Sequence, residues 1–206
     1  MKYKIKDIEN VTAVKITQKK TDVQVQITIK LKSAIDAQNL QVKLVSNLQG
    51  FNQIDKKTVD NYIEAWNIPN KIGTIIKKYT GEIKPTIKKP RDARRMFADE
   101  FTVAEQNEIL LWLQKNKTLI VSDILKGRGQ FAAEWMLVAQ KTKINSRWIL
   151  KPMNLCLNHF GNGDIEITNR GNFKIGRITM QRKGGDGGRP SANMLQFKIN
   201  PAELFD

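Results

Sequence analysis

Three polar side chains near the carboxyl end of the chain have the types and spacing needed to hold a divalent cation. Asp164 lies in a short alternating segment, residues 163–168, and Gln181 and Lys183 lie two apart in a later alternating segment. Residues two apart on a strand share a face. A hairpin of the two segments would therefore bring these three side chains together, and a small shift of register would replace Asp164 by Glu166.

Such a set suits the hydrolysis of a phosphodiester. A carboxylate-held Mg²⁺ neutralises the phosphate charge and lowers the pKa of a bound water. Mg²⁺ prefers oxygen ligands and keeps several waters, so one carboxylate and one amide oxygen can suffice. We therefore expect Mg²⁺ as cofactor, held by Asp164 and Gln181, with the ammonium of Lys183 orienting the water and stabilising the transition state. The plain alternative is a solvated surface hairpin.

The arrangement resembles the signature of the PD-(D/E)xK nuclease superfamily, an acidic residue on one strand and (D/E)-x-K on the next. Here it is Asp164, sixteen residues, then Gln181-Arg182-Lys183. The Gln-x-Lys variant is similar to that of some short-site type II restriction endonucleases, and residues 177–201 resemble the ends of small bacterial enzymes of this kind. Two departures are that Gly163, not Pro, precedes Asp164, and that Gln181 replaces an acid.

The resemblance implies a site-specific endonuclease that cuts double-stranded DNA, with a companion methyltransferase protecting the host genome. It leaves monomer and homodimer open, and no spacing rule gives the recognition sequence or the stagger of the cut. The family often adds a glutamate from the helix before the strands, and Glu134 matches that place, although an ion pair for stability would explain it equally. The alternatives are a non-catalytic DNA- or RNA-binding protein and a repair or recombination nuclease of the same superfamily.

Two further segments have the composition of DNA contacts. In the glycine-rich segment after Lys183, Arg189 could contact guanine and Asn193 adenine; the alternative is a flexible loop that closes the sheet. A basic stretch over residues 84–95 and a glycine break near residue 128 suit phosphate contacts, or else a solvated linker. The residues expected to contact phosphates are Lys89, Arg91, Arg94, Arg95 and Arg128.

Composition supports a polyanionic partner. The net charge is +15 and the pI is about 9.9, while 40% of residues are hydrophobic, enough for a folded core. A single cysteine, Cys156, and a single histidine, His159, exclude an intrachain disulfide and a Cys/His zinc site. With no apolar run long enough for a membrane span and no signal peptide, we expect a cytoplasmic protein.

The pattern of elements predicts an α+β (mixed α/β) fold, a restriction-endonuclease-like core with a central mixed sheet flanked by helices. We expect residues 1–100 to form an N-terminal strand-helix lobe that contacts DNA and residues 101–206 the catalytic core, or one continuous domain over 1–206. Expected strands are residues 11–17, 22–31, 148–150, 164–168, 173–183 and 194–199. Expected helices begin at residues 58, 69, 102 and 131, and the tryptophans expected in the core are Trp66, Trp112, Trp135 and Trp148.

Overall fold

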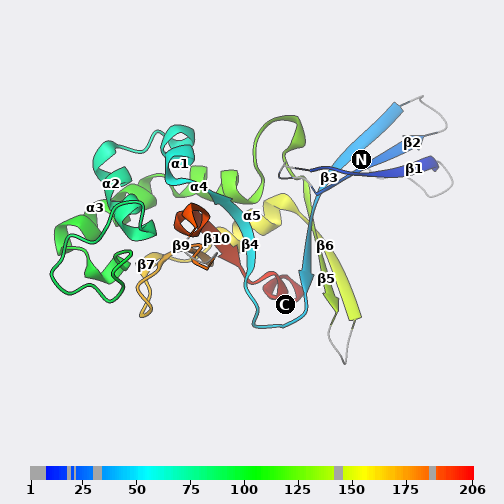
Figure 1. The fold of residues 1–206 in the computed structure, drawn as a ribbon. Helices are drawn as coiled ribbons and strands as arrows, with labels where there is room; N and C mark the ends of the chain where they lie inside the picture. The colour runs from blue at the N-terminus through cyan, green and yellow to red at the C-terminus, as the bar shows by residue number, and fades with distance from the viewer. Residues whose placement is uncertain (1–7, 18–19, 21, 30–33, 142–145, 186–188) are drawn as a thin grey trace. The chain divides into compact units, whose positions relative to one another are not determined.

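The chain folds into two compact units, each built from segments that are distant in sequence (Figure 1). The computed structural model describes residues 8–17, 20, 22–29, 34–141, 146–185 and 189–206. The first unit comprises residues 1–50, 125–157 and 200–206, and the second comprises residues 51–124 and 158–199. Residue 100 falls inside the second unit, and whether DNA contact and catalysis divide there stays a prediction.

The first unit contains a five-stranded mixed sheet, called here the first sheet, with the order β1-β2-β3-β5-β6. Strands β1, β2 and β3 form an antiparallel meander, β3 pairs with β5 in parallel, and β5 pairs with β6 in antiparallel. The whole of residues 51–124 lies between β3 and β5 in sequence. The strands are β1 (Ile8–Lys15), β2 (Val23–Ile29), β3 (Ala34–Val45), β5 (Trp135–Lys141) and β6 (Ser146–Pro152).

The two faces of the first sheet differ in burial. Gln41 on β3 and its cross-strand partner Met136 on β5 are buried, as is Val138 on the same face. On the opposite face, Leu44 is 60% exposed and Trp148, on the edge strand β6, is 72% exposed. The expectation that Trp148 lies in the core is therefore wrong, because alternation shows which residues share a face but not which face is covered.

The chain end belongs to the first unit, and one helix begins in the first unit and ends in the second. The 3-10 helix η6 (Pro201–Phe205) packs against β3, β5 and β6. The guanidinium of Arg147 on β6 lies 4.2 Å from the centre of the Phe205 ring. Helix α5 (Met153–Gly161) follows β6 directly and leads into the second unit.

The second unit contains a five-stranded sheet, called here the second sheet, with the order β4-β10-β9-β8-β7. Every neighbouring pair in it is antiparallel. The strands are β4 (Asn52–Lys57), β7 (Ile165–Ile167), β8 (Phe173–Ile175), β9 (Ile178–Arg182) and β10 (Leu195–Ile199).

Helix ends in the second unit follow the predicted signals. The Thr58 side chain accepts a hydrogen bond from the Asn61 backbone at the start of the first helix, and Gly81 ends the second with a φ of 89°. Thr102 and Glu105 form the predicted capping box. The helices are α1 (Val59–Trp66), α2 (Asn70–Thr80), α3 (Val103–Lys115) and α4 (Lys117–Leu125), with the 3-10 turns η2 (Ala98–Glu100) and η5 (Pro190–Asn193). The 3-10 turn η3 (Gly129–Phe131) belongs to the first unit.

Aromatic side chains join the helices to the second sheet. Tyr62 and Trp66 of α1 contact Phe197 of β10, with ring centres 5.5 and 5.8 Å from that ring. Tyr79 of α2 meets Phe173 of β8 edge to face at 5.0 Å. All five are buried, and the burial of their aromatic surface stabilises the contact between the helices and the second sheet.

Two predicted elements are wrong. Residues 131–141 form η3 and then strand β5, not a helix. A buried central strand and a buried helix give similar apolar runs, so periodicity could not separate them. Residues 173–183 are two strands, β8 and β9, because the chain reverses at Gly176, whose φ is 58°.

Candidate active site

The predicted site residues Asp164, Gln181 and Lys183 all lie in the second unit, but the predicted pairing of their strands is wrong. Strand β8 lies between β7 and β9. Asp164 precedes β7, and its carbonyl accepts a hydrogen bond from the Gly176 backbone at 2.9 Å. The hairpin turn at Gly176 separates the two strands that the continuous pattern over residues 173–183 appeared to join.

The register then sets how far these side chains lie from one another. Ile165 aligns with Ile175, and Ile175 with Ile178, so Asp164 and Gln181 are four residues out of step on strands two apart. This corresponds to about 10 Å across the sheet and about 13 Å along it. One ion with ligands at about 2.1 Å cannot join the two. Glu166 is two residues out of step with Gln181 on the same two strands, and its carboxylate pairs with Lys174 at 2.8 Å.

Glu134 lies outside any helix, in the residue before β5 of the first unit. Its backbone N–H donates to the Asn39 carbonyl at 2.8 Å, and its carboxylate accepts from the Asn39 backbone N–H at 3.1 Å. The expected helical position is therefore wrong. Glu134 instead ties the start of β5 to β3.

The first sheet contains a second arrangement with the same three residue types, and here the strands are direct neighbours. Asp22 precedes β2, and Gln41 and Lys43 lie two apart on β3, which pairs with β2. The Asp22 carboxylate accepts a hydrogen bond from the Val42 backbone N–H at 2.6 Å, and the Asp22 backbone donates to the Leu40 carbonyl at 2.8 Å. Asp22, Gln41 and Lys43, called here the Asp22 site, therefore meet at one end of the β2–β3 ladder.

Gln41 carries an oxygen that the described part of the chain does not satisfy. Its residue is 1% exposed, and its Oε1 is buried with no hydrogen-bond partner among the described residues. An unsatisfied buried polar atom costs about 1–3 kcal/mol. A cation at this oxygen would remove that cost, and the neighbouring Asp22 carboxylate would supply negative charge to hold it.

Lys43 completes the Asp22 site. Burial lowers the pKa of its ammonium, while the Asp22 carboxylate opposes that shift by raising it. The lysine therefore lies near enough to Asp22 for the two charges to interact, in surroundings that exclude much of the water. A lysine with a lowered pKa gives up its proton more readily than an exposed one.

The donors of the Asp22 site fit a hard divalent cation. A carboxylate and an amide oxygen are ligands that Mg²⁺ accepts, with water in the remaining positions. No group of three or more His, Cys, Asp or Glu side chains able to hold a metal occurs among the described residues. A sparse oxygen site of this kind suits Mg²⁺ better than zinc, which favours nitrogen and sulfur ligands.

A polar network holds β3 beside the Asp22 site. The Asn39 side chain donates to the carbonyls of Gln130 and Ala132 at 2.8 and 3.1 Å and accepts from the Gln24 amide at 3.1 Å. Asn39 is 7% exposed and shares a face with Gln41. With Glu134 on its backbone, it connects β2, β3 and the segment before β5, so the strand that carries Gln41 and Lys43 has little freedom to shift.

The sequence did carry a signal for the Asp22 site. Eighteen residues separate Asp22 from Gln41-Val42-Lys43, an acid followed by Gln-x-Lys as in the Asp164 arrangement. Asp22 also stands at the start of the clearest alternating strand pattern in the chain, at 22–31. The two arrangements have nearly equal spacing, so only the pairing of strands distinguishes them.

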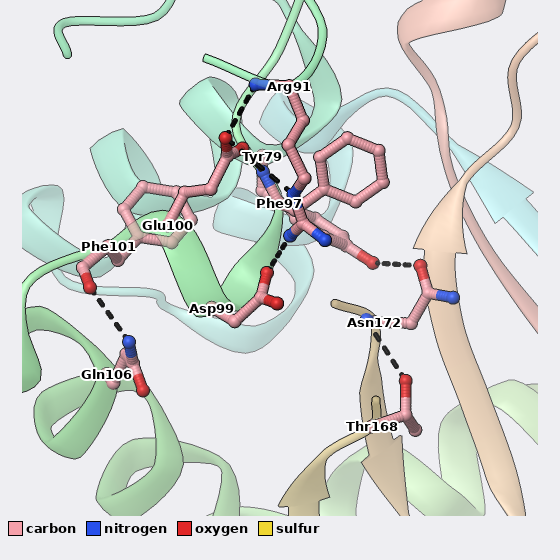
Figure 2. Close-up of polar contacts among 9 residues, drawn as sticks. All are labelled: Tyr79, Arg91, Phe97, Asp99, Glu100, Phe101, Gln106, Thr168 and Asn172. Carbon is pink, nitrogen blue, oxygen red and sulfur yellow. Dashed lines mark hydrogen bonds and ion pairs between the residues drawn. The ribbon is translucent and has the colours of Figure 1, made fainter. Parts of the chain in front are cut away.

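Part of the basic stretch over residues 84–95 makes contacts within the second unit, and Figure 2 shows those of Arg91. Arg91 pairs with Asp99, and its backbone N–H donates to the Glu100 carboxylate. The guanidiniums of Arg91 and Arg95 lie 4.2 and 3.8 Å from the centre of the Phe97 ring. These contacts hold Arg91 and Arg95 within the second unit, whereas Lys84, Lys88 and Lys89 of the same stretch are exposed.

Of the remaining residues predicted to contact DNA, one is already hydrogen-bonded within the protein and three are exposed. Both ends of the Asn193 amide are used, since its Nδ2 donates to the Gly81 carbonyl and its Oδ1 accepts from Arg182. Lys89, Arg128 and Arg189 are exposed. Contact of these three with DNA stays a prediction.

A comparison with solved structures identifies the fold. The structure is similar to the crystal structure of restriction endonuclease MspI in complex with its cognate DNA, with a TM-score of 0.66 and 14% identity. The match covers 95% of this chain and 72% of the other. The fold is therefore that of a restriction endonuclease, and the predicted mixed α+β class is confirmed.

The sequence identifies the family. The chain belongs to the R.HinP1I restriction endonuclease family, whose profile matches residues 1–205. It is a type II site-specific endonuclease, as the resemblance implied. The family generally uses a divalent metal ion. No curated protein sequence gives a match to this chain, and no helix among the described residues is long and apolar enough to cross a membrane.

Proposed function

We propose that this endonuclease hydrolyses double-stranded DNA with Mg²⁺ at the Asp22 site. The observation that carries the proposal is the buried, unsatisfied Oε1 of Gln41 beside the carboxylate of Asp22 and the ammonium of Lys43. An acid, an amide oxygen and an ammonium on adjacent strands are the three parts that the chemistry needs.

Each residue has a defined role. Asp22 Oδ2 accepts from the Val42 backbone, which orients the carboxylate and leaves Oδ1 as a cation ligand. Gln41 Oε1 is the second ligand. Mg²⁺ held there supplies a Lewis acid that neutralises phosphate charge and acidifies water. Lys43 orients the attacking water and stabilises the charge that develops on the phosphate oxygens.

The substrate and partners follow from the family and the charge. The DNA in the MspI structure and the net charge of +15 both support duplex DNA as the ligand. A companion DNA methyltransferase would protect the host genome at the same site. We propose a cytoplasmic location, consistent with the single, free and buried Cys156, and leave monomer and homodimer to measurement.

The sequence-based site, with Asp164, Gln181 and Lys183 aided by Glu134, is the rival assignment. Two matched variants, Lys43→Ala and Lys183→Ala, separate it from the Asp22 site, since each removes one lysine two residues after a glutamine. We expect the wild type and Lys183→Ala to cut phage DNA into discrete fragments in Mg²⁺. Lys43→Ala should cut roughly 100-fold more slowly or worse, because a group that stabilises the transition state is lost.

Duplex binding without Mg²⁺, measured by fluorescence anisotropy, is the control for folding in both variants. The reverse result, with Lys183→Ala inactive and Lys43→Ala active, would assign the chemistry to the second sheet. If both variants cut DNA as fast as the wild type, neither lysine takes part in the mechanism. If the wild type itself fails to cut in Mg²⁺, the proposed cofactor or activity is wrong.

A further inference from the structure

Residues 94–95 and the end of strand β9 are far apart in sequence but lie close together in the second unit. They place three arginines together. Arg182 ends β9, and its guanidinium donates to the Asn193 side chain at 2.8 Å. Asn193 in turn donates to the Gly81 carbonyl at 3.1 Å. Gly81 lies directly against residues 94 and 95, since a Cβ built on it would meet the Arg94 carbonyl at 2.5 Å. We call Arg94, Arg95 and Arg182 the arginine cluster.

Strand β9 makes a second connection between the same segments. The Tyr79 hydroxyl donates to the Met180 carbonyl at 3.0 Å, and Met180 lies two residues before Arg182 on the same face of β9. The guanidinium of Arg95 lies 5.7 Å from the centre of the Tyr79 ring and 3.8 Å from that of Phe97. The position of Arg95 is therefore set by aromatic rings, and that of Arg182 by an amide.

The cluster has more positive charge than its surroundings neutralise. Asp92 is the carboxylate beside it, and both of its oxygens accept hydrogen bonds from Arg94, at 2.9 Å each. Arg182 makes no ion pair within the described part of the chain. Burial, and then the charges of Arg94 and Arg95, lower the pKa of Arg182, and only Asp92 opposes them. Holding like charges together in this way is unfavourable unless an anion joins them.

We propose that the arginine cluster binds a phosphate of the DNA backbone and that Asn193 positions Arg182 for this contact instead of reading an adenine. The proposal rests on the proposed function only in taking duplex DNA as the ligand. The cluster belongs to the second unit, whereas the Asp22 site belongs to the first. The arginine cluster therefore belongs to a different unit from the residues proposed for catalysis.

A phosphate fits the arrangement better than a base edge does. Reading guanine needs one free, in-plane arginine fork. The guanidinium of Arg94 is already hydrogen-bonded to Asp92, and that of Arg95 is stacked on the Phe97 ring. One N–H of Arg182 donates to Asn193. The three arginines share a positive charge, and a phosphodiester oxygen is attracted by positive charges that converge on it from several directions.

The test measures duplex binding with Ca²⁺ in place of Mg²⁺, by fluorescence anisotropy over a range of salt concentrations. Arg182→Gln should weaken binding about tenfold, as expected for one charged hydrogen bond. The slope of log affinity against log salt should fall by about 0.9, the value for one phosphate contact. Both effects should be the same on every duplex sequence. Arg182→Lys, which keeps the charge, should restore most of the slope.

Three further variants complete the test, and the first of them guards against a folding defect. Arg94 is exposed, so Arg94→Gln should fold normally and should also reduce the salt slope. Asn193→Asp puts a carboxylate beside Arg182 and should weaken binding to all sequences alike. Lys71→Gln removes an exposed charge that pairs with Glu108 on the helices and should leave the slope unchanged.

Three results would overturn the inference. One is an unchanged slope in both Arg182→Gln and Arg94→Gln. Another is a loss in Asn193→Asp confined to duplexes with adenine at one position, which would make Asn193 a base reader. The third is an equal loss in Lys71→Gln, which would make the effect one of total charge. Failure of the proposed function is separate, because wild-type protein that binds DNA but does not cut it in Mg²⁺ would refute the activity and leave these slopes to be measured.

Discussion

At the scale of single residues, Gln41 is the position where the Asp22 site departs from the nuclease signature. The signature has an acid two residues before the lysine, and here Gln41 stands there before Lys43. A glutamine is a weaker ligand than a glutamate because it carries no charge. The Asp22 site therefore holds one formal negative charge and, with Lys43 protonated, one positive charge. We expect the binding of Mg²⁺ to be weak in the free protein and to strengthen when the phosphate oxygens of DNA supply further ligands.

The substitution Gln41→Glu tests this view of the ligand set. It adds a carboxylate at the unsatisfied oxygen and should lower the Mg²⁺ concentration for half-maximal cleavage roughly tenfold, since ligand charge sets cation affinity. Without Mg²⁺ the variant should unfold at lower temperature, because a buried carboxylate at residue 41 is desolvated and repels that of Asp22. Mg²⁺ titrations of cleavage and thermal unfolding measure both effects.

Gln140→Glu is the matched control, since Gln140 is a buried glutamine of the same sheet whose Oε1 accepts from Arg147 instead. An equal change of Mg²⁺ dependence in both variants would show that Gln41 has no special relation to the ion.

At the scale of elements, the turn between β8 and β9 decides the layout of the second sheet. Gly176 has a φ of 58°, and a Cβ there would meet the carbonyl oxygens of Phe160, Gly161 and Asn162 at 2.7 Å. Gly184 has a similar φ of 68°, and a Cβ there would have no atom of the described residues within 4 Å. The two glycines thus separate the cost of the backbone conformation from the cost of close contact.

Gly176→Ala should lower the free energy of unfolding by more than Gly184→Ala. We expect about 1 kcal/mol for the positive φ in both variants, and about 2 kcal/mol more at Gly176 for the displaced carbonyls. Urea unfolding of the two variants beside the wild type gives the difference directly. Equal losses would mean that the chain relaxes around residue 176 and that the turn is not a tight constraint.

At the scale of the whole molecule, the charge of +15 governs how the enzyme meets DNA. Positive charge that neutralises six to ten phosphates makes affinity fall by roughly 10³–10⁵ between about 50 and 200 mM salt. We expect wild-type binding to a non-cognate duplex to follow this dependence, measured by anisotropy with Ca²⁺. A flat response would mean that the surplus charge lies away from the bound DNA.

Much of the molecule followed from the sequence because the relevant physics is local. Strand alternation predicted β2, the side chains of Thr58 and Thr102 predicted helix starts, and Gly81 predicted a helix end. The class of enzyme was implied by the resemblance of Asp164 and Gln181-Arg182-Lys183 to a nuclease signature, and the excess of positive charge indicated a polyanionic partner.

Only the tertiary structure decided which acid belongs with which glutamine and lysine. Asp22 with Gln41 and Asp164 with Gln181 have almost the same spacing in the chain, but β2 pairs directly with β3 while β8 separates β7 from β9. It also decided that β3 pairs in parallel with β5, although residues 51–124 lie between them in the sequence. Hydrogen bonds between strands are made by backbone groups common to all residues, so the order of strands depends on how the complete chain packs and cannot be deduced from spacing alone.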